Sequence, residues 1–130
     1  MDLILDTCGL LSLAGLAERP LSGKTLKRIR DAGSVGVSAC SAFEIAIKHK
    51  KGALSLGRFS TPDLFWREAL RAYDLNEVSV SSELFLASTR LPDHHADPFD
   101  RLIVATALSA DSAVVTYDRL IAMYSVECLA

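Results

Sequence analysis

The sequence predicts an α/β fold of three layers, with a mainly parallel central sheet covered by helices on both faces. Three short apolar runs, at 3–5, 35–37 and 113–116, show no alternation of apolar and polar residues. Runs of this kind are typical of strands buried on both faces of a parallel sheet. Helical segments separate the runs, and such an alternation of strands and helices places a parallel sheet between two helical layers.

The first half of the chain is expected to hold two strands and three helices. Pro20 and Gly33 are stop signals for the first two helices, and Gly52 ends the third. The expected elements are, in order, a strand at 3–5, helices over 9–17 and 22–32, a strand at 35–37 and a helix over 39–51.

The second half continues the pattern. Thr61, Pro62 and Asp63 combine a helix cap, a proline in the first turn and a first-turn acid, so they predict the start of a helix. The expected elements are helices over 61–73, 81–91 and 98–108, a short helix over 119–124, strands at 78–80 and 113–116, and an edge strand at 126–129.

Two carboxylates lie three residues apart at the start of the apolar helix over 98–108. Pro98 fits the first turn, where a missing N–H costs nothing, so Asp97 is expected to be the N-cap. Asp100 then lies in the first turn beside Asp97, and two such anions repel unless positive charge is near. The helix N-terminus supplies part of that charge, and a divalent cation would supply the rest. A cap plus a first-turn acid without a metal is the alternative.

The composition is that of one globular domain over residues 1–130. Apolar residues make up 50% of the chain, charged residues 23%, and the net charge is −2. This charge argues against a strongly basic protein that coats nucleic acid. No apolar run approaches the ~20 residues of a membrane span. Asp2 and Asp6 stand where a secretion signal needs a basic start, so we expect a cytoplasmic protein without a membrane partner.

Cysteine and histidine residues give no metal-binding pattern. Cys8, Cys40 and Cys128 have no C-x-x-C spacing and are expected to be small buried hydrophobes. His94 and His95 are adjacent in a loop, and adjacent side chains rarely converge on one ion. We therefore expect both histidines to be exposed.

Four acids, Asp6, Glu44, Asp100 and Asp118, are expected at one rim of the sheet. Asp6 and Asp118 each follow a buried strand, where ligands bind in open α/β sheets. Glu44 is the only acid in its helix. Asp6 could also cap a helix, and Glu44 could form a surface pair with Lys48. Mg²⁺ and Mn²⁺ prefer carboxylate oxygens, and no serine or cysteine nucleophile pattern competes. The cluster therefore favours phosphodiester hydrolysis by metal-activated water.

Four segments in order resemble a PIN domain, in particular the toxin ribonucleases of VapBC-type toxin–antitoxin pairs. The most specific is His95 with Asp97-Pro98-Phe99-Asp100-Arg101 and the alanine-rich helix that follows. The other three are Leu3-Ile4-Leu5-Asp6-Thr7, Ser38 to Lys48 with Glu44-Ile45-Ala46-Ile47-Lys48, and Val114-Val115-Thr116-Tyr117-Asp118. The chain departs from the subgroup at Cys8 and at Ser12-Leu13, where histidine and tryptophan are frequent.

The resemblance implies a Mg²⁺-dependent ribonuclease, with Mn²⁺ as a second candidate ion. The implied catalytic residues are Asp6, Glu44, Asp100 and Asp118, of which the three aspartates hold the metal. Thr116 matches a supporting hydroxyl and Asp97 a frequent extra acid. Lys48 and Arg101 are candidate phosphate contacts.

The resemblance also implies protein partners, namely a second copy of the chain and a cognate antitoxin. An antitoxin groove would lie near the first helices, and its candidate residues are Leu10, Leu11, Leu13 and Leu16. Packing of the same leucines in the core is the expected alternative.

Two other functions compete with the nuclease. In a Mg²⁺-dependent aspartyl-phosphate protein, Asp6 would be a nucleophile, and Glu44 and Asp100 would be hard to explain. A non-catalytic PIN-like RNA-binding module would tolerate loss of the acids.

Overall fold

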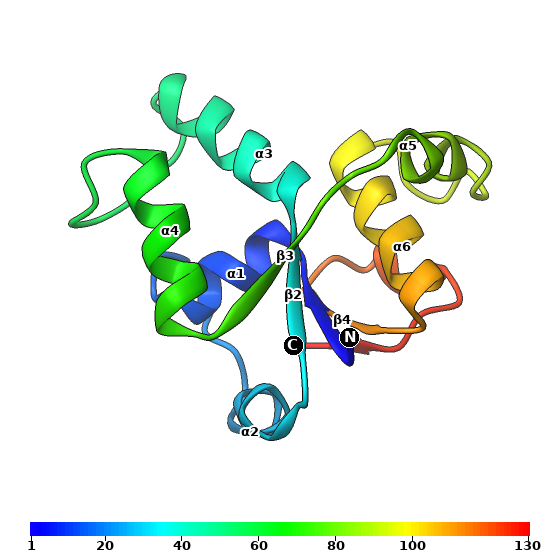
Figure 1. The fold of residues 1–130 in the computed structure, drawn as a ribbon, viewed down its shortest axis with the longest axis horizontal. Helices are drawn as coiled ribbons and strands as arrows, with labels where there is room; N and C mark the ends of the chain where they lie inside the picture. Colours follow the sequence, from blue (N-terminus) through cyan, green and yellow to red (C-terminus); the bar gives the residue numbers. More distant parts are fainter.

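A computed structural model describes all 130 residues as a five-stranded parallel sheet with helices on both faces (Figure 1). The strand order is β3-β2-β1-β4-β5, and every neighbouring pair is parallel. The strands are β1 (Leu3–Leu5), β2 (Val35–Ser38), β3 (Leu75–Val78), β4 (Ala113–Val115) and β5 (Cys128–Leu129). The helices are α1 (Thr7–Leu13), α2 (Gly23–Asp31), α3 (Ala39–Lys50), α4 (Pro62–Ala72), α5 (Ser82–Thr89), α6 (Pro98–Ala110) and the short 3-10 helix η1 (Ile121–Met123). The predicted fold class is confirmed.

Strand β1 forms the centre of the sheet and separates two hydrophobic cores. Leu3 pairs with Val35 on one side and with Ala113 on the other. Leu3 and Leu5 face the core that packs against α1 and α4, whereas Ile4 faces the core of α6 and η1. In Figure 1 the sheet is seen edge on, with α1 and α4 to its left and α5 and α6 to its right. This two-sided burial explains why the strands lack an alternating pattern.

The sequence placed one strand wrongly. The predicted strand at 78–80 lies instead at Leu75–Val78. Asp74, which adopts a positive φ of 51°, turns the chain directly from α4 into this strand. Asn76 and Glu77 are exposed because β3 is an edge strand, so the buried apolar run used as the signal is absent here.

Two helices are shorter than predicted. Helix α1 ends at Leu13 and not at residue 17, because Gly15 turns the chain with a φ of 75°. The expected helix over 119–124 is reduced to the single turn η1. No helix combines the length and the apolar character that a membrane span requires.

The cysteines and the leucines of α1 only partly follow the predictions. Cys40 is buried and Cys128 half-buried, but Cys8 is exposed, so the expectation of burial is wrong for Cys8. Leu10 and Leu11 are core residues, as the packing alternative predicted, and they are not open to a partner.

Gly9 allows α1 to start directly beside the end of β4. A Cβ atom at this position would lie 2.5 Å from the backbone oxygen of Val115 and 3.0 Å from Asp6 Oδ1. A backbone oxygen cannot rotate away, so the first turn of the helix and the Asp6 cap would have to shift.

We expect Gly9→Ala to lower the free energy of unfolding by about 2 kcal/mol, the usual cost of forcing an atom into a packed site. Urea denaturation of the metal-free protein measures this change. Gly23→Ala is the matched control, because a Cβ there meets nothing within 4 Å. Equal stability of the two variants would contradict the packing argument.

Candidate metal centre

Asp6 connects the central strand to the first helix and lies at the centre of the acidic rim. It follows β1 and caps α1, and its Oδ1 accepts the Gly9 N–H at 2.6 Å. Its Oδ2 accepts a hydrogen bond from the Thr116 hydroxyl, which in turn accepts the Asp118 N–H at 2.9 Å. Asp6 is therefore the N-cap of α1, which the sequence offered as the alternative to a role in the site. This capping role coexists with the position at the rim, and Thr116 links Asp6 to the Asp118 segment.

Burial raises the pKa of Asp6 to about 6, in spite of its hydrogen bonds with Thr116 and Gly9. The side chain is only 2% exposed. The negative charges of Asp118 and Glu44 raise the pKa further. A buried carboxylate among other acids is in its charged form only at a cost, and a cation close to it would remove that cost.

Glu44 approaches the rim from α3, in the second turn after β2. Its Oε1 accepts the Thr7 hydroxyl at 2.6 Å, and its Oε2 pairs with Lys48 Nζ at 2.8 Å. The hydrogen bond with Glu44 raises the pKa of Lys48. The predicted Glu44–Lys48 pair is thus present, but Glu44 itself is buried, so it is not a pair of two surface residues.

The start of α6 brings Asp100 to the same rim. Asp97 caps the helix as predicted, because its Oδ1 accepts the Phe99 N–H at 2.8 Å and the Asp100 N–H at 3.3 Å. Burial raises the pKa of Asp100 to about 7, and the charge of Asp97 contributes. The charges of Asp6 and Glu44 act in the same direction, which couples the acids of three separate elements.

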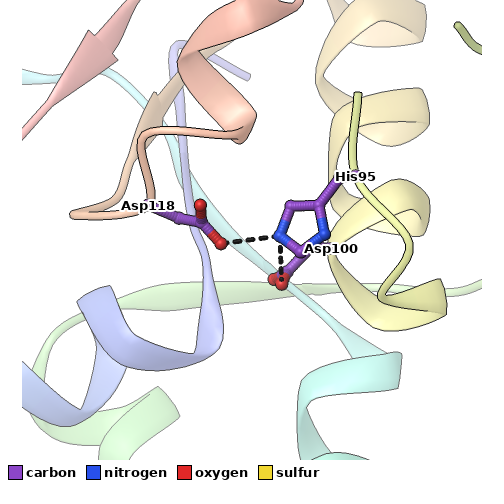
Figure 2. Close-up of side chains that lie close together, drawn as sticks. All are labelled: His95, Asp100 and Asp118. Carbon is purple, nitrogen blue, oxygen red and sulfur yellow. Dashed lines mark hydrogen bonds and ion pairs between the residues drawn. The ribbon is translucent and has the colours of Figure 1, made fainter. Parts of the chain in front are cut away.

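His95 lies between Asp100 and Asp118 and is the site residue that the sequence prediction missed. Figure 2 shows its ring between the two carboxylates, with Nε2 2.7 Å from Asp118 Oδ2 and 3.1 Å from Asp100 Oδ2. One ligand atom from each of these three residues can be chosen so that all lie within 4.8 Å of one another. His94 is exposed, so the expectation of exposure is right for His94 and wrong for His95. The usable signal was the position of His95 two residues before a helix cap.

Asp118 is the one acid of the cluster whose pKa is lowered. Burial alone would raise its pKa, but the hydrogen bond with His95 and those from the N–H groups of Leu120 and Ile121 outweigh this effect. Leu120 N–H donates to Oδ1 at 2.8 Å, while Oδ2 faces His95. Asp118 is therefore held as an anion, beside two acids that resist ionisation.

Arg101 supports the loop that carries His95. Its guanidinium donates to backbone oxygens of the preceding helix and loop, at distances from 2.8 to 3.2 Å. These acceptors are the carbonyl groups of Ser88, Leu91, Pro92 and His95. The side chain is 12% exposed, and Asp93 lies 3.6 Å from it. The contacts give Arg101 a structural role, and the phosphate contact suggested by the sequence stays a prediction.

Removal of the guanidinium is expected to destabilise the fold. Arg101→Met leaves several partly buried carbonyl groups without their donor, and we expect a loss of about 3 kcal/mol in the free energy of unfolding. Urea denaturation beside Arg67→Met, which changes an exposed arginine of α4, measures this loss. A change in Arg101→Met no larger than that of the control would show that the carbonyl groups are satisfied without Arg101.

The donor set of the rim fits a hard divalent cation. Ligand atoms of Asp100 and Asp118 lie close together, with His95 beside them, whereas Asp6 and Glu44 are not part of that compact group. The charges of Asp6 and Glu44 nevertheless act on Asp100, so all these acids contribute negative charge to the rim. Oxygen ligands with surplus negative charge are those that Mg²⁺ and Mn²⁺ select. Burial, with the charges of neighbouring acids, raises the pKa of Asp6 and of Asp100, and a cation beside them would favour their charged forms.

One family of known proteins matches almost the whole chain. The family model described as "PIN domain" matches residues 3–126. A search of curated proteins gave no match.

Two solved structures share the fold at low sequence identity. A toxin-antitoxin complex from Klebsiella pneumoniae matches with a TM-score of 0.65 and 15% identity, over 99% of this chain and 97% of the other. PAE2754 from Pyrobaculum aerophilum matches with a TM-score of 0.61 and 18% identity, over 98% of this chain and 83% of the other. At sequence identities of 15% and 18%, the similarity to these two structures shows a shared fold and nothing further.

Proposed function

The chain belongs to the PIN domain family, and from this premise we propose that it is a metal-dependent endoribonuclease, the toxin of a type II toxin–antitoxin pair. The observation that carries the proposal is the convergence of Asp6, Glu44, Asp100 and Asp118 at one rim of the sheet, with the pKa of two of them raised. The whole of residues 1–130 acts as one catalytic domain.

Each acid has a distinct part in the proposed site. Asp6, Asp100 and Asp118 hold Mg²⁺ or Mn²⁺, and Glu44 completes the negative charge around it. A bound ion of this type lowers the pKa of a water molecule and polarises a phosphate oxygen. Thr116 holds Asp6 by a hydrogen bond, and Asp97 aligns Asp100 by capping its helix.

Lys48 is the basic residue that we assign to the RNA phosphate. Its side chain is 48% exposed, and its Nζ is held 2.8 Å from Glu44 Oε2 at the edge of the acidic cluster. An ammonium group in this place can balance the charge of a phosphodiester beside the metal.

The geometry also bears on the competing function in which Asp6 is phosphorylated. Asp6 is 2% exposed, and both of its oxygens already accept hydrogen bonds, from Gly9 N–H and from the Thr116 hydroxyl. A nucleophilic oxygen must be reached in line by the phosphorus atom of a substrate, whereas a metal ligand needs only a small ion beside it, so the burial of Asp6 is less compatible with the role of a nucleophile.

An antitoxin is the protein partner that we propose. The similarity to the Klebsiella pneumoniae toxin-antitoxin complex supports this choice. Leu13 and Leu16 are half-buried, and Leu13 borders a groove of about 440 Å³ with Leu26 and Ile29. We propose that an apolar segment of the antitoxin binds in this groove. We also propose that the complex forms in the cytoplasm.

A homodimer is the second assembly that we propose. Phe43 and Phe85 are 62% and 51% exposed and line one apolar groove together with Phe99. Exposed apolar patches of this kind are typical of protein interfaces. Sedimentation of the protein, with a chain mass of 14.1 kDa, should give about twice that mass, and Phe43→Glu should give the monomer.

The ribonuclease proposal is tested by incubating purified protein with total RNA in Mg²⁺, in Mn²⁺ and in EDTA. Discrete fragments that form only with the metal support it, as does growth arrest when the protein is expressed alone in bacteria. RNA that stays intact but is bound by the folded protein would favour the non-catalytic RNA-binding module.

A further inference from the structure

The contacts of His95 raise the question of whether it binds the metal or holds the ligands. Its Nε2 lies 2.7 Å from Asp118 Oδ2 and 3.1 Å from Asp100 Oδ2 (Figure 2). The side chain is 10% exposed, so water does not compete freely for these contacts. A histidine so placed could be a third ligand beside the two carboxylates, or a hydrogen-bond donor to them.

The other ring nitrogen decides between these roles. Nδ1 lies 3.1 Å from the backbone nitrogen of Asp97, and a backbone N–H can only donate. Nδ1 is therefore the acceptor and carries no proton, which leaves Nε2 as the ring nitrogen that donates. Nε2–H then donates to Asp118 Oδ2, the nearer of the two carboxylate oxygens. Coordination of a metal by Nε2 would move the proton to Nδ1 and set it against the Asp97 N–H.

We propose that His95 is a positioning residue of the metal centre and not a metal ligand. Its ring donates from Nε2 and holds the Asp118 carboxylate beside Asp100, where both could bind the cation. This inference rests on the proposed function, since it concerns how the carboxylates of that site are aligned. A hydrogen-bonded group behind a metal ligand typically contributes 10–100-fold to metal affinity or activity.

The backbone on both sides of the ring is fixed, as a positioning role requires. The His95 N–H donates to Tyr124 Oη at 3.1 Å, and the His95 carbonyl accepts from Arg101 Nη1 at 3.0 Å. Tyr124 Oη itself donates to the Pro92 carbonyl at 2.8 Å. Asp118 Oδ2 accepts one hydrogen bond, from His95, and keeps an acceptor site, while the N–H groups of Leu120 and Ile121 also bond to the carboxylate.

The tautomer is tested by NMR of protein labelled with ¹⁵N in its histidine rings. We expect the His95 ring, assigned by its loss in His95→Gln, to carry its proton on Nε2 in the metal-free protein and to keep it there at saturating Mg²⁺. A proton on Nδ1, or its transfer to Nδ1 when Mg²⁺ is added, would overturn the proposal. His94→Gln controls for the adjacent exposed ring.

A pair of substitutions tests the role in metal binding. His95→Gln can place an amide N–H near the position of Nε2, whereas His95→Ala has no donor. We expect Mg²⁺ affinity, measured by calorimetry, to fall about tenfold in His95→Ala and to be largely restored in His95→Gln. Equal loss in both variants overturns the positioning role. Absence of Mg²⁺ binding and of RNA cleavage in the unmodified protein would instead reject the proposed function.

Discussion

Asp6→Asn is expected to abolish metal-dependent RNA cleavage, with a loss of at least about a thousandfold in rate. A bound metal ion contributes several kcal/mol of transition-state stabilisation, and each 1.4 kcal/mol corresponds to about tenfold in rate. Asparagine keeps an oxygen for the Gly9 N–H and an amide for Thr116, so the fold should remain. The measurement is the cleavage rate of a labelled RNA in Mg²⁺.

The matched control for this prediction is Asp93→Asn. Asp93 belongs to the loop before α6, but its side chain is fully exposed and lies outside the acidic cluster. We expect this variant to cleave RNA at the original rate. Cleavage by Asp6→Asn at the same rate as by Asp93→Asn would show that Asp6 does not hold the ion.

The stability of the metal-free protein is expected to fall as the pH rises from about 4 to about 7. Asp6 has a pKa of about 6 in the fold, against 3.8 for a free aspartate. Between these values the folded state binds more protons than the unfolded state, so the free energy of unfolding decreases with pH. Two pKa units correspond to about 3 kcal/mol for Asp6. Asp100, with a pKa of about 7, extends the decrease to neutral pH.

Urea unfolding in EDTA at a series of pH values measures this dependence. The difference between the unmodified protein and Asp6→Asn isolates the contribution of Asp6, because asparagine does not titrate. We expect Asp6→Asn to gain stability relative to the unmodified protein up to pH 6 and then to level off. At pH 7.5, Mg²⁺ should raise the free energy of unfolding of the unmodified protein again, because the ion binds only the folded state. A pH-independent difference between the two proteins would contradict the raised pKa.

Much of the fold followed from local patterns in the sequence. The strands at the centre of the sheet are short runs buried on both faces, and the predicted caps Thr61 and Asp97 mark helix starts by their own hydrogen bonds. Edge strand β3 was misplaced because its neighbouring residues Asn76 and Glu77, which point to opposite faces, are both exposed, so the buried apolar run is absent. Features that depend on residues distant in the sequence, such as which strand lies at the edge of the sheet, cannot be predicted from local sequence patterns.

In the candidate site, too, some features could be predicted from the sequence and others could not. The positions of the four acids at one rim could be predicted, because each follows a strand or lies near the start of a helix, whereas their roles in a metal site stay a prediction. The contacts of His95 could not be predicted, since its partners Asp118 and Tyr124 lie 23 and 29 residues away. The structural contacts of Arg101 could not be predicted either, because a sequence shows the charge of an arginine but not the carbonyl groups that surround it.

Diffraction from a crystal soaked in Mn²⁺, with data collected for anomalous scattering, tests most directly whether the acidic rim is a metal centre. We predict an anomalous peak within coordination distance of carboxylate oxygens of Asp6, Asp100 and Asp118, with the His95 ring outside the coordination sphere. A cluster without a peak at saturating Mn²⁺, in a protein that still cleaves RNA, would contradict the account.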